Sequence, residues 1–375
     1  MKRIGMADVG DGLCMKLNMI SDSKIYIDCG SQQGGECAFK GLKRIDHDYC
    51  HRSHFLNQCH VHSIFILSHF HADHYNGLIH VANNTQQGYK FNLDQIYFPL
   101  IPDFELRKEF MTILFCMAQT TLGNKTGSMP ADLINVVRKI NSRNFMARPL
   151  SEGETLYING VRLEILWPPR TLPKNKEIKI VSEIEKSIDK FEELKDKYEQ
   201  IQDTYDKIKS GNLFEPYFSE QPTTYESTQS NEEIEKPATE QAELPLPNEI
   251  KEFNGYLRDV ANYFSLSFVI DDRFLFLGDL GTSEIGQVIS KLNNDERRNF
   301  YVLVAPHHGT HWHHNLRRAY FVYTLSSVGC KLVAKMNPEF KAISEFKLAT
   351  HVNGDIILPF RFCLNCCYSW YCHYK

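Results

Sequence analysis

Three histidines and one aspartate lie within six residues at the end of a short apolar run. Residues 64–77 read IFILSHFHADHYNG, and their metal-binding side chains are His69, His71, Asp73 and His74. Imidazole nitrogens with a carboxylate are typical ligands of Zn²⁺, and a larger share of carboxylate favours Mn²⁺. A lone histidine is more often a hydrogen-bonded core residue, but four ligand-type side chains at this spacing predict a metal site.

The elements around this stretch predict how the ligands are positioned. The apolar residues 64–67 indicate a buried strand, and a helix is expected after the cluster. In the extended part His69 and His71 point to one side, whereas Asp73 and His74 follow where the chain turns. We therefore expect two neighbouring ions, the first bound by His69 and His71 and the second by Asp73 and His74.

The His-x-His-x-Asp-His signature resembles that of the metallo-β-lactamase superfamily of binuclear metallohydrolases. Upstream, residues 8–12 read DVGDG and residues 27–30 read IDCG. The metallohydrolase domain of the bacterial DNA-uptake (competence) channel has similar segments in the same order. The resemblance implies an α/β protein with the αβ/βα four-layer sandwich of the metallo-β-lactamase fold. Asp28 is expected either to hydrogen-bond a ligand histidine or to cap a turn.

The competence-type family also has an Asn-x-x-Ser segment before a strand that ends in Gly-Asp. Here residues 262–265 read NYFS, and a predicted strand, turn and second strand lead to Gly278-Asp279. The resemblance implies that Asp279 is the carboxylate that bridges the two ions. On its own, Asp279 would rather be interpreted as the cap of a helix predicted at 282–292.

A pair of histidines follows the next predicted buried strand. Residues 306–310 read PHHGT, which is similar to the His-His-Gly-Ser element of the family. The resemblance implies that one of His307 and His308 completes the second metal site. The other would protonate the leaving group or contact a substrate phosphate, and the sequence leaves open which is which. The three histidines in 311–314 are interpreted as the polar start of a helix.

One ligand of the wider superfamily is missing. No histidine occurs between His80 and His307, where most members have the third histidine of the first metal site. Competence-type members also lack it, so its absence favours that subgroup. The first ion is then bound only by His69, His71 and Asp279, and a labile site of this kind makes Mn²⁺ or Mg²⁺ plausible beside Zn²⁺.

Residues 174–255 differ in composition from the rest of the chain. A capping-box signal and apolar residues at spacings of three and four predict a helix over 183–210, which packs along the body, binds a protein partner or self-associates. Residues 212–249 contain nine Glu and one Lys, which predicts a disordered acidic linker. Because the formal net charge of the chain is −4, the remaining residues carry about +4 and are mildly basic.

The chain is thus expected to consist of four segments. Residues 1–173 and 256–358 are the two halves of the sandwich, and residues 174–255 are the charged helical insertion. Residues 359–375 form a tail that is rich in cysteine and aromatic residues. This tail is either a zinc knuckle or an apolar segment packed on the body.

The compartment is inferred from what the sequence lacks. The first residues, MKRIGMADVG, have no apolar core of a signal peptide, and no run of about 18 apolar residues exists. Eleven cysteines without a secretion signal favour reduced thiols. We expect a soluble cytoplasmic protein without membrane contact.

These features predict a hydrolase with two divalent ions, Zn²⁺ or Mn²⁺, that activate a water molecule. Asp73, His307 and His308 are the expected catalytic residues. A phosphodiesterase or nuclease acting on nucleic acid or a nucleotide is favoured, because of the subgroup resemblance and the basic body. Two alternatives stay open: a hydrolase of a small ester, thioester or cyclic nucleotide, and a catalytically degenerate metal-binding interaction module.

Overall fold

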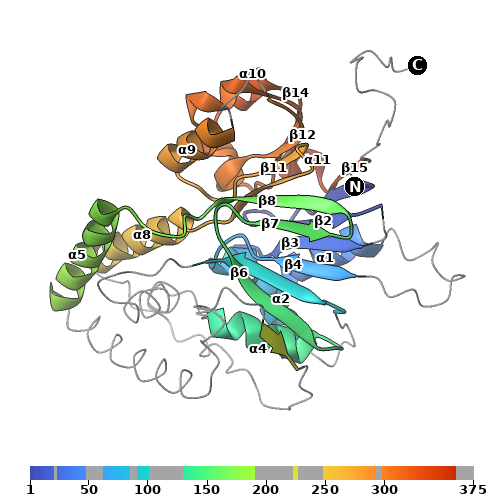
Figure 1. The fold of residues 1–375 in the computed structure, drawn as a ribbon, viewed down its shortest axis with the longest axis horizontal. Helices are drawn as coiled ribbons and strands as arrows, with labels where there is room; N and C mark the ends of the chain where they lie inside the picture. Colours follow the sequence, from blue (N-terminus) through green and yellow to red (C-terminus); the bar gives the residue numbers. More distant parts are fainter. Residues whose placement is uncertain are drawn as a thin grey trace, which may run out of the picture.

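The computed structural model describes residues 1–20, 23–47, 62–84, 91–100, 130–190, 223–226, 248–292 and 298–359. These residues form two β-sheets that face each other, and helices cover the outer face of each sheet (Figure 1). The predicted tail at 359–375, apart from Pro359, and most of the predicted linker at 212–249 lie outside the described residues.

The first sheet has eight strands, in the order β15-β1-β2-β3-β4-β5-β6-β9. Strands β3 to β6 are parallel, and the others pair antiparallel with their neighbours. Their bounds are Arg3–Met6 (β1), Cys14–Asn18 (β2), Lys24–Cys29 (β3), Ser63–Ile66 (β4), Gln95–Pro99 (β5), Phe145–Leu150 (β6), Thr223–Tyr225 (β9) and Ile356–Pro359 (β15).

The second sheet has seven strands, in the order β14-β13-β12-β11-β10-β8-β7, of which β11 to β14 are parallel. Their bounds are Thr155–Ile158 (β7), Val161–Trp167 (β8), Ser267–Ile270 (β10), Phe274–Phe276 (β11), Arg298–Val304 (β12), Ala319–Ser326 (β13) and Ser344–Ala349 (β14).

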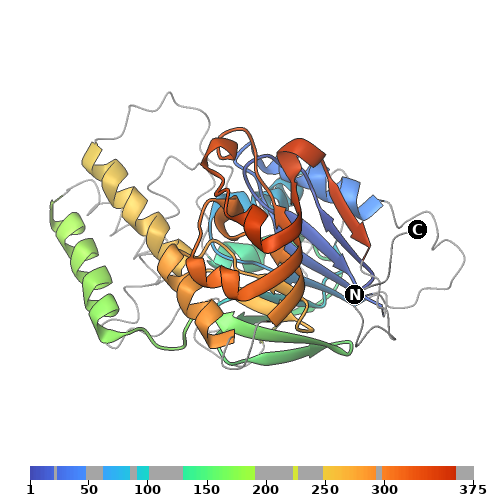
Figure 2. The same cartoon turned by 90° about the horizontal axis from the view of Figure 1, so that it is seen from above.

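Three helices, α1, α2 and α4, lie on the side of the first sheet, and α9 and α10 lie on the side of the second (Figure 1). Helices α5 and α8 contact each other and extend together from one end of the sandwich (Figure 2). The bounds are Gly35–His47 (α1), Asn76–Asn83 (α2), Pro130–Ile140 (α4), Lys174–Lys190 (α5), Asn248–Tyr263 (α8), Thr282–Leu292 (α9), Phe340–Ile343 (α10) and Thr350–Asn353 (α11).

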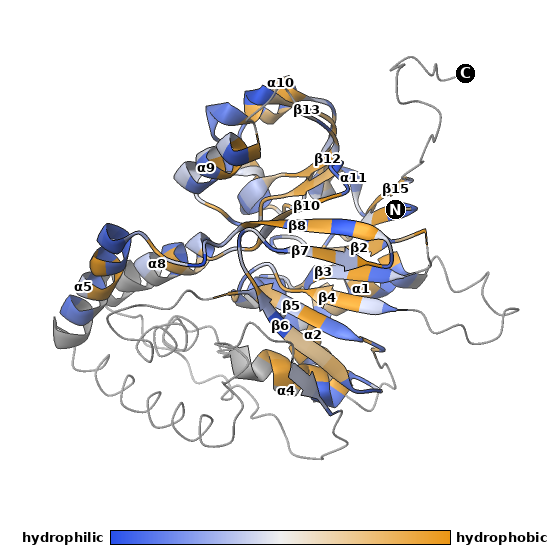
Figure 3. Cartoon of the chain, viewed as in Figure 1, coloured by the Kyte–Doolittle hydropathy of each residue, from blue (hydrophilic) through white to orange (hydrophobic). Residues whose placement is uncertain are grey.

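The apolar run in β4 shows how the layers are held together. Ile64 and Ile66 belong to the core between the sheets, whereas Phe65 and Leu67 belong to the core under the helices. All four side chains are completely buried, and each contributes about 1.5–3 kcal/mol relative to an exposed position. The strands of both sheets are correspondingly hydrophobic along much of their length (Figure 3). The predicted αβ/βα sandwich is thus confirmed.

Residues 155–167 form a β-hairpin. Strands β7 and β8 pair antiparallel around Asn159 and Gly160, which have φ of 49° and 82°. Positive φ at both central residues is the type I′ turn that Asn-Gly favours.

Three local features outside the site complete the fold. Residues Val333–Lys335 form a 3-10 helix, because the carbonyl of Gly329 accepts the amides of Leu332 and Val333. Strands β14 and β15 follow one another along the chain but belong to different sheets. Within the predicted disordered linker, residues 223–225 form β9, which pairs with the edge strand β6.

The charged insertion starts as part of the body. Its helix α5 begins at Lys174, before the predicted start, because the carbonyl of Pro173 accepts the amides of Lys176 and Glu177. Ile180 and Val181 are buried in the main core. Beyond Lys190 the predicted helix lies outside the described residues. Within the described ranges, no helix has the length and apolar character needed to cross a membrane.

Candidate metal centre

The ligand loop after β4 is held against two glycine turns near the N-terminus. A Cβ on Gly30 would lie 2.2 Å from the carbonyl carbon of Asp73 and 2.3 Å from the amide nitrogen of His74. A Cβ on Gly12 would lie 2.4 Å from the carbonyl oxygen of Gly30. The backbones approach closely only because both residues are glycine, so the DVGDG and IDCG segments serve to position the ligand loop.

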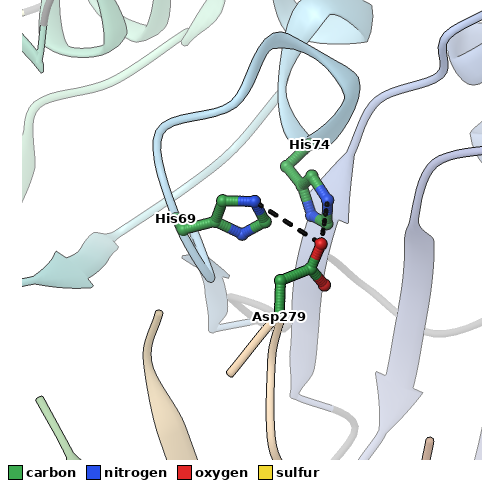
Figure 4. A group of neighbouring side chains, drawn as sticks. All are labelled: His69, His74 and Asp279. Carbon is green, nitrogen blue, oxygen red and sulfur yellow. Dashed lines mark ion pairs between the residues drawn. The ribbon is translucent and has the colours of Figure 1, made fainter. Parts of the chain in front are cut away.

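Four imidazole rings converge on one carboxylate oxygen. Oδ2 of Asp279 lies 3.7 Å from Nε2 of His69, His74 and His307 and 3.8 Å from Nε2 of His308. Asp279 follows β11, the first two histidines follow β4, and the last two follow β12. Figure 4 shows the rings of His69 and His74 on two sides of the Asp279 carboxylate.

The separations and the burial fit a metal ion. Distances of 3.7–3.8 Å are too long for hydrogen bonds, but ligand atoms bound at about 2.0–2.2 Å to one cation stand roughly this far apart. Nε2 of His74 and Nε2 of His71 are buried without a hydrogen-bond partner in the described part of the chain. Such atoms are costly to bury unless a partner is bound.

Two groups of three side chains have ligand atoms within 4.8 Å of one another: His69, His74 and Asp279, and Asp73, His74 and His308. The sequence instead divided the ligands into His69 with His71 and Asp73 with His74. The structure places His74 in both groups, because the 3-10 turn Ala72–His74 returns its ring between the others. His71 lies beside them, with Nδ1 3.0 Å from Nε2 of His69.

The orientation of His74 is set by a buried carboxylate. Oδ2 of Asp28 lies 2.7 Å from Nδ1 of His74, while the amide and hydroxyl of Ser68 donate to the same carboxylate at 2.7 and 2.5 Å. Asp28 is fully buried and has φ of 56°, which turns the chain at the end of β3. Of the two roles predicted for Asp28, the hydrogen bond to a ligand histidine is observed.

His307 and His308 differ in their surroundings. His308 is buried, and its Nδ1 donates to the carbonyl of Ser327 at 2.8 Å, so that Nε2 faces Asp279. The side chain of His307 is 28% exposed. Both residues have positive φ, 48° and 60°, a conformation that costs roughly 1–3 kcal/mol at a non-glycine residue. The backbone amide of His307 donates to the carbonyl of Gly278 at 3.0 Å and so ties this turn to the loop of Asp279.

His311 belongs to the site, although the sequence placed it at a helix start. Its Nε2 lies 2.8 Å from Nδ1 of His307, and its own Nδ1 donates to the carbonyl of Leu280 at 2.9 Å. The helix start is correct for its neighbours, since His313 accepts from the amide of Asn315. The spacing of four residues between His307 and His311 was the available signal.

Burial and neighbouring charges set the protonation states. Burial lowers the pKa of His69 well below its ordinary value, and lowers the pKa of His71 and His307 to about 4. Burial also opposes the charged form of His74, but Asp28 and Asp279 outweigh it and raise its pKa to about 9. Burial alone would raise the pKa of the Asp279 carboxyl. The surrounding imidazoles outweigh this effect and hold the pKa well below its usual range. The cluster thus offers an ionised carboxylate and mainly neutral imidazoles, which are the forms that bind metal.

The similarity of this chain to known proteins is limited. No protein-family model and no curated protein matches the sequence. Among solved structures, the chain is similar to the metallo-β-lactamase fold protein YhfI from Bacillus subtilis, with a TM-score of 0.37 and 10% identity over 96% of this chain and 100% of that chain. The identity is low, so the ligands are assigned from the geometry of this chain alone. Its buried His/Asp cluster, at the strand ends of the sandwich, defines a candidate metal-binding site.

Proposed function

We propose that the protein is a metal-dependent phosphodiesterase that acts on nucleic acid or a nucleotide. The observation that carries the proposal is the convergence of four imidazole Nε2 atoms on Oδ2 of Asp279, at 3.7–3.8 Å. A buried carboxylate surrounded in this way is the arrangement needed for a ligand shared by two cations. The complete ligand set argues against the alternative of a catalytically degenerate metal-binding interaction module.

Each candidate group can hold one divalent ion, Zn²⁺ or Mn²⁺. His69 and His74 would hold the first ion and Asp73 and His308 the second, with the carboxylate of Asp279 available to both. When bound, such ions lower the pKa of a water molecule and neutralise charge on a phosphate oxygen. The buried carboxylate of Asp28 would keep His74 in the tautomer that presents Nε2.

His307 is the member of the cluster best suited to proton transfer. It is more exposed than the other rings, so substrate can reach it. Burial lowers its pKa to about 4, and the ring is therefore neutral near pH 7. Nδ1 of His307 donates a hydrogen bond to Nε2 of His311 at 2.8 Å. Nε2 of His307 then carries no proton and can accept one from the reacting atoms. His307 is accordingly the general base, and His311 orients it.

A phosphodiester is favoured over a thioester or lactone by the charges around the cluster. Arg258 on α8 is exposed. Burial and Asp73 have the largest effects on the pKa of His71, and the positive charge of Arg258 lowers this pKa further. Its guanidinium thus lies within electrostatic reach of the ligands, where an anionic substrate would be stabilised. The mildly basic remainder of the chain acts in the same direction.

The proposal is tested with a substrate panel on purified protein loaded with Mn²⁺ or Zn²⁺. Single-stranded and duplex DNA, RNA, cyclic nucleotides, a thioester and a lactone are compared under the same conditions. We expect hydrolysis of phosphodiesters only, with loss of turnover of at least 100-fold in Asp73→Asn. Turnover of a thioester or lactone without phosphodiester cleavage would refute the substrate class. Full activity in Asp73→Asn would identify a contaminating nuclease.

A further inference from the structure

The loop of residues 329–337, which follows β13, is fastened to the turn that carries His308. The carbonyl of Ser327, two residues before the loop, accepts a hydrogen bond from Nδ1 of His308 at 2.8 Å. The amide of Asn337, the last residue of the loop, donates to the carbonyl of Gly309 at 2.8 Å. Both ends of the loop therefore lie against a ligand of the second metal group or the residue beside it.

A buried carboxylate ties the same loop to another ligand of this group. Asp11 is completely buried, and its carboxylate accepts the amides of Gly329 at 2.8 Å and of Lys331 at 3.3 Å. The carbonyl of Asp11 accepts the amide of Gln32 at 2.6 Å, and Nε2 of Gln32 donates to Oδ2 of Asp73 at 3.1 Å. The loop thus borders the metal centre on the side of its second group.

Two lysines of this loop are available to bind an anion. Lys331 and Lys335 are exposed, and neither side chain has an ion pair or hydrogen bond with any residue in the described ranges. The surrounding stretch, residues 306–338, contains four Lys and Arg and neither Asp nor Glu. One of its arginines, Arg317, is already paired with Glu339. The two lysines are therefore free positive charges beside the centre.

The spacing of the lysines suits successive phosphates of one strand. The carbonyl of Leu332 accepts the amide of Lys335 at 2.8 Å, so the chain from Lys331 to Lys335 is wound as a helical turn. Four residues wound in this way span roughly 6–8 Å. A nucleic-acid strand carries one charge about every 3.4 Å along its axis. The two ammonium groups can thus contact different phosphates of the same strand.

We propose that Lys331 and Lys335 bind the sugar–phosphate backbone of a polynucleotide strand next to the phosphate that is cleaved. The inference rests on the proposed phosphodiesterase function and makes its substrate more specific. A nucleoside monophosphate or a cyclic nucleotide places its single phosphate at the metal ions and offers no further phosphate to the loop. Because the contacts are to phosphate oxygens, binding is independent of base sequence.

The test measures strand binding rather than turnover. Full-length protein is titrated onto a fluorescently labelled single-stranded DNA at several salt concentrations, with a chelator present so that the strand stays intact. The double variant Lys331→Gln, Lys335→Gln should bind about tenfold more weakly at low salt. The slope of the logarithm of the affinity against the logarithm of the salt concentration should fall by about 1.4, because each contact to a single strand contributes about 0.7. Loss of a purely structural role would not change this slope.

Two matched controls separate the charge of the loop from its structure and from the overall charge. Lys331→Arg with Lys335→Arg keeps both charges and should bind like the unaltered protein. Lys40→Gln with Lys186→Gln removes the same charge from α1 and α5, at side chains that are 67% and 68% exposed, and should leave the affinity and the slope unchanged. Thermal melting checks that each variant is folded. Equal losses in the two glutamine double variants, or unaltered binding in both, would overturn the proposal.

Competition identifies the class of the occupant. Unlabelled single-stranded DNA should displace the labelled strand, whereas polyglutamate of equal charge and adenosine 5′-monophosphate should not. Equal displacement by polyglutamate would overturn the assignment to nucleic acid, and equal displacement by the nucleotide would overturn the need for a polymer. Strand binding that depends on both lysines but is not followed by cleavage in Mn²⁺ would support the loop and reject the proposed reaction. Cleavage with unaltered strand binding in Lys331→Gln, Lys335→Gln would reject the loop alone.

Discussion

Nδ1 of His74 lies 2.7 Å from Oδ2 of Asp28, and both side chains are buried. The contact joins the end of β3 to the ligand loop after β4, two parallel neighbours in the first sheet. It leaves Nε2 of His74 directed at Asp279 without any hydrogen-bond partner among the described residues. Asp28 is therefore the positioning residue on which the shared histidine of both metal groups depends.

Replacing Asp28 by asparagine should weaken divalent-metal binding roughly 10- to 100-fold, because the amide no longer fixes the tautomer of His74. Metal affinity is measured by competition with a chromophoric chelator. Asp46→Asn is the matched control, since Asp46 forms a partly buried ion pair with Lys16 outside the metal centre. It should lower the free energy of unfolding but leave metal affinity unchanged. Equal metal affinity in Asp28→Asn and the unaltered protein would contradict the role of Asp28.

Metal affinity should rise with pH between about 7 and 9. Asp28 and Asp279 outweigh burial and hold the pKa of His74 at about 9, so an ion must displace a proton from this ring below that pH. The stability of the metal-free fold changes in the opposite direction, because the raised pKa of His74 contributes stability that is complete below pH 6.5 and is lost as pH rises through about 9. Titrations with Mn²⁺ at several pH values measure the first effect. An affinity that is constant from pH 7 to 9 would contradict it.

Gly30→Ala should damage the metal centre through the backbone. The added Cβ would lie 2.2 Å from the Asp73 carbonyl carbon, so the ligand loop must move. We expect a loss of about 3 kcal/mol in the free energy of unfolding, together with weaker metal binding. Gly255→Ala on α8 is the control, because nothing lies within 4 Å of its added Cβ; it should stabilise the protein by about 0.5–1 kcal/mol. Chemical denaturation measures both, and comparable stabilities for the two variants would count against the close approach.

His307→Ala and His308→Ala should separate proton transfer from metal binding. His308 is buried, and its carbonyl contact to Ser327 directs Nε2 into a metal group, so its removal should lower metal content and turnover together. His307→Ala should keep the metal content and reduce kcat by about 10²–10⁴-fold, as expected for loss of a general base. Metal analysis and steady-state kinetics on both variants decide this. The reverse pattern would exchange the two assignments.

The sequence predicted the parts of the site that depend on short local patterns. The apolar strand followed by His69, His71, Asp73 and His74, and the Gly-Asp turn at Asp279, both fall where strands end at the site. These patterns are readable because strand ends and turns are specified by adjacent residues.

The remaining features depend on contacts that adjacent residues do not specify. His74 is shared by two groups only because a 3-10 turn returns its ring to Asp279. The role of His311 arises from the positive φ at His307 and His308, which brings it against His307. Helix α1 and strand β13 were not predicted. Strand β9 lies in an acidic stretch whose composition suggests disorder, and it forms by pairing with the edge of the first sheet.

The central claim, that Asp279 holds divalent metal among the converging imidazoles, is tested most directly by anomalous scattering. Crystals grown with Zn²⁺ or Mn²⁺ are measured at energies above and below the absorption edge of that metal. We predict an anomalous peak about 2.0–2.2 Å from Oδ2 of Asp279 and from Nε2 of His69 or His74, with a second peak beside Asp73 and His308. Asp279→Asn should lose at least one of these peaks. A map without a peak at Asp279, or identical peaks in Asp279→Asn, would contradict the assignment.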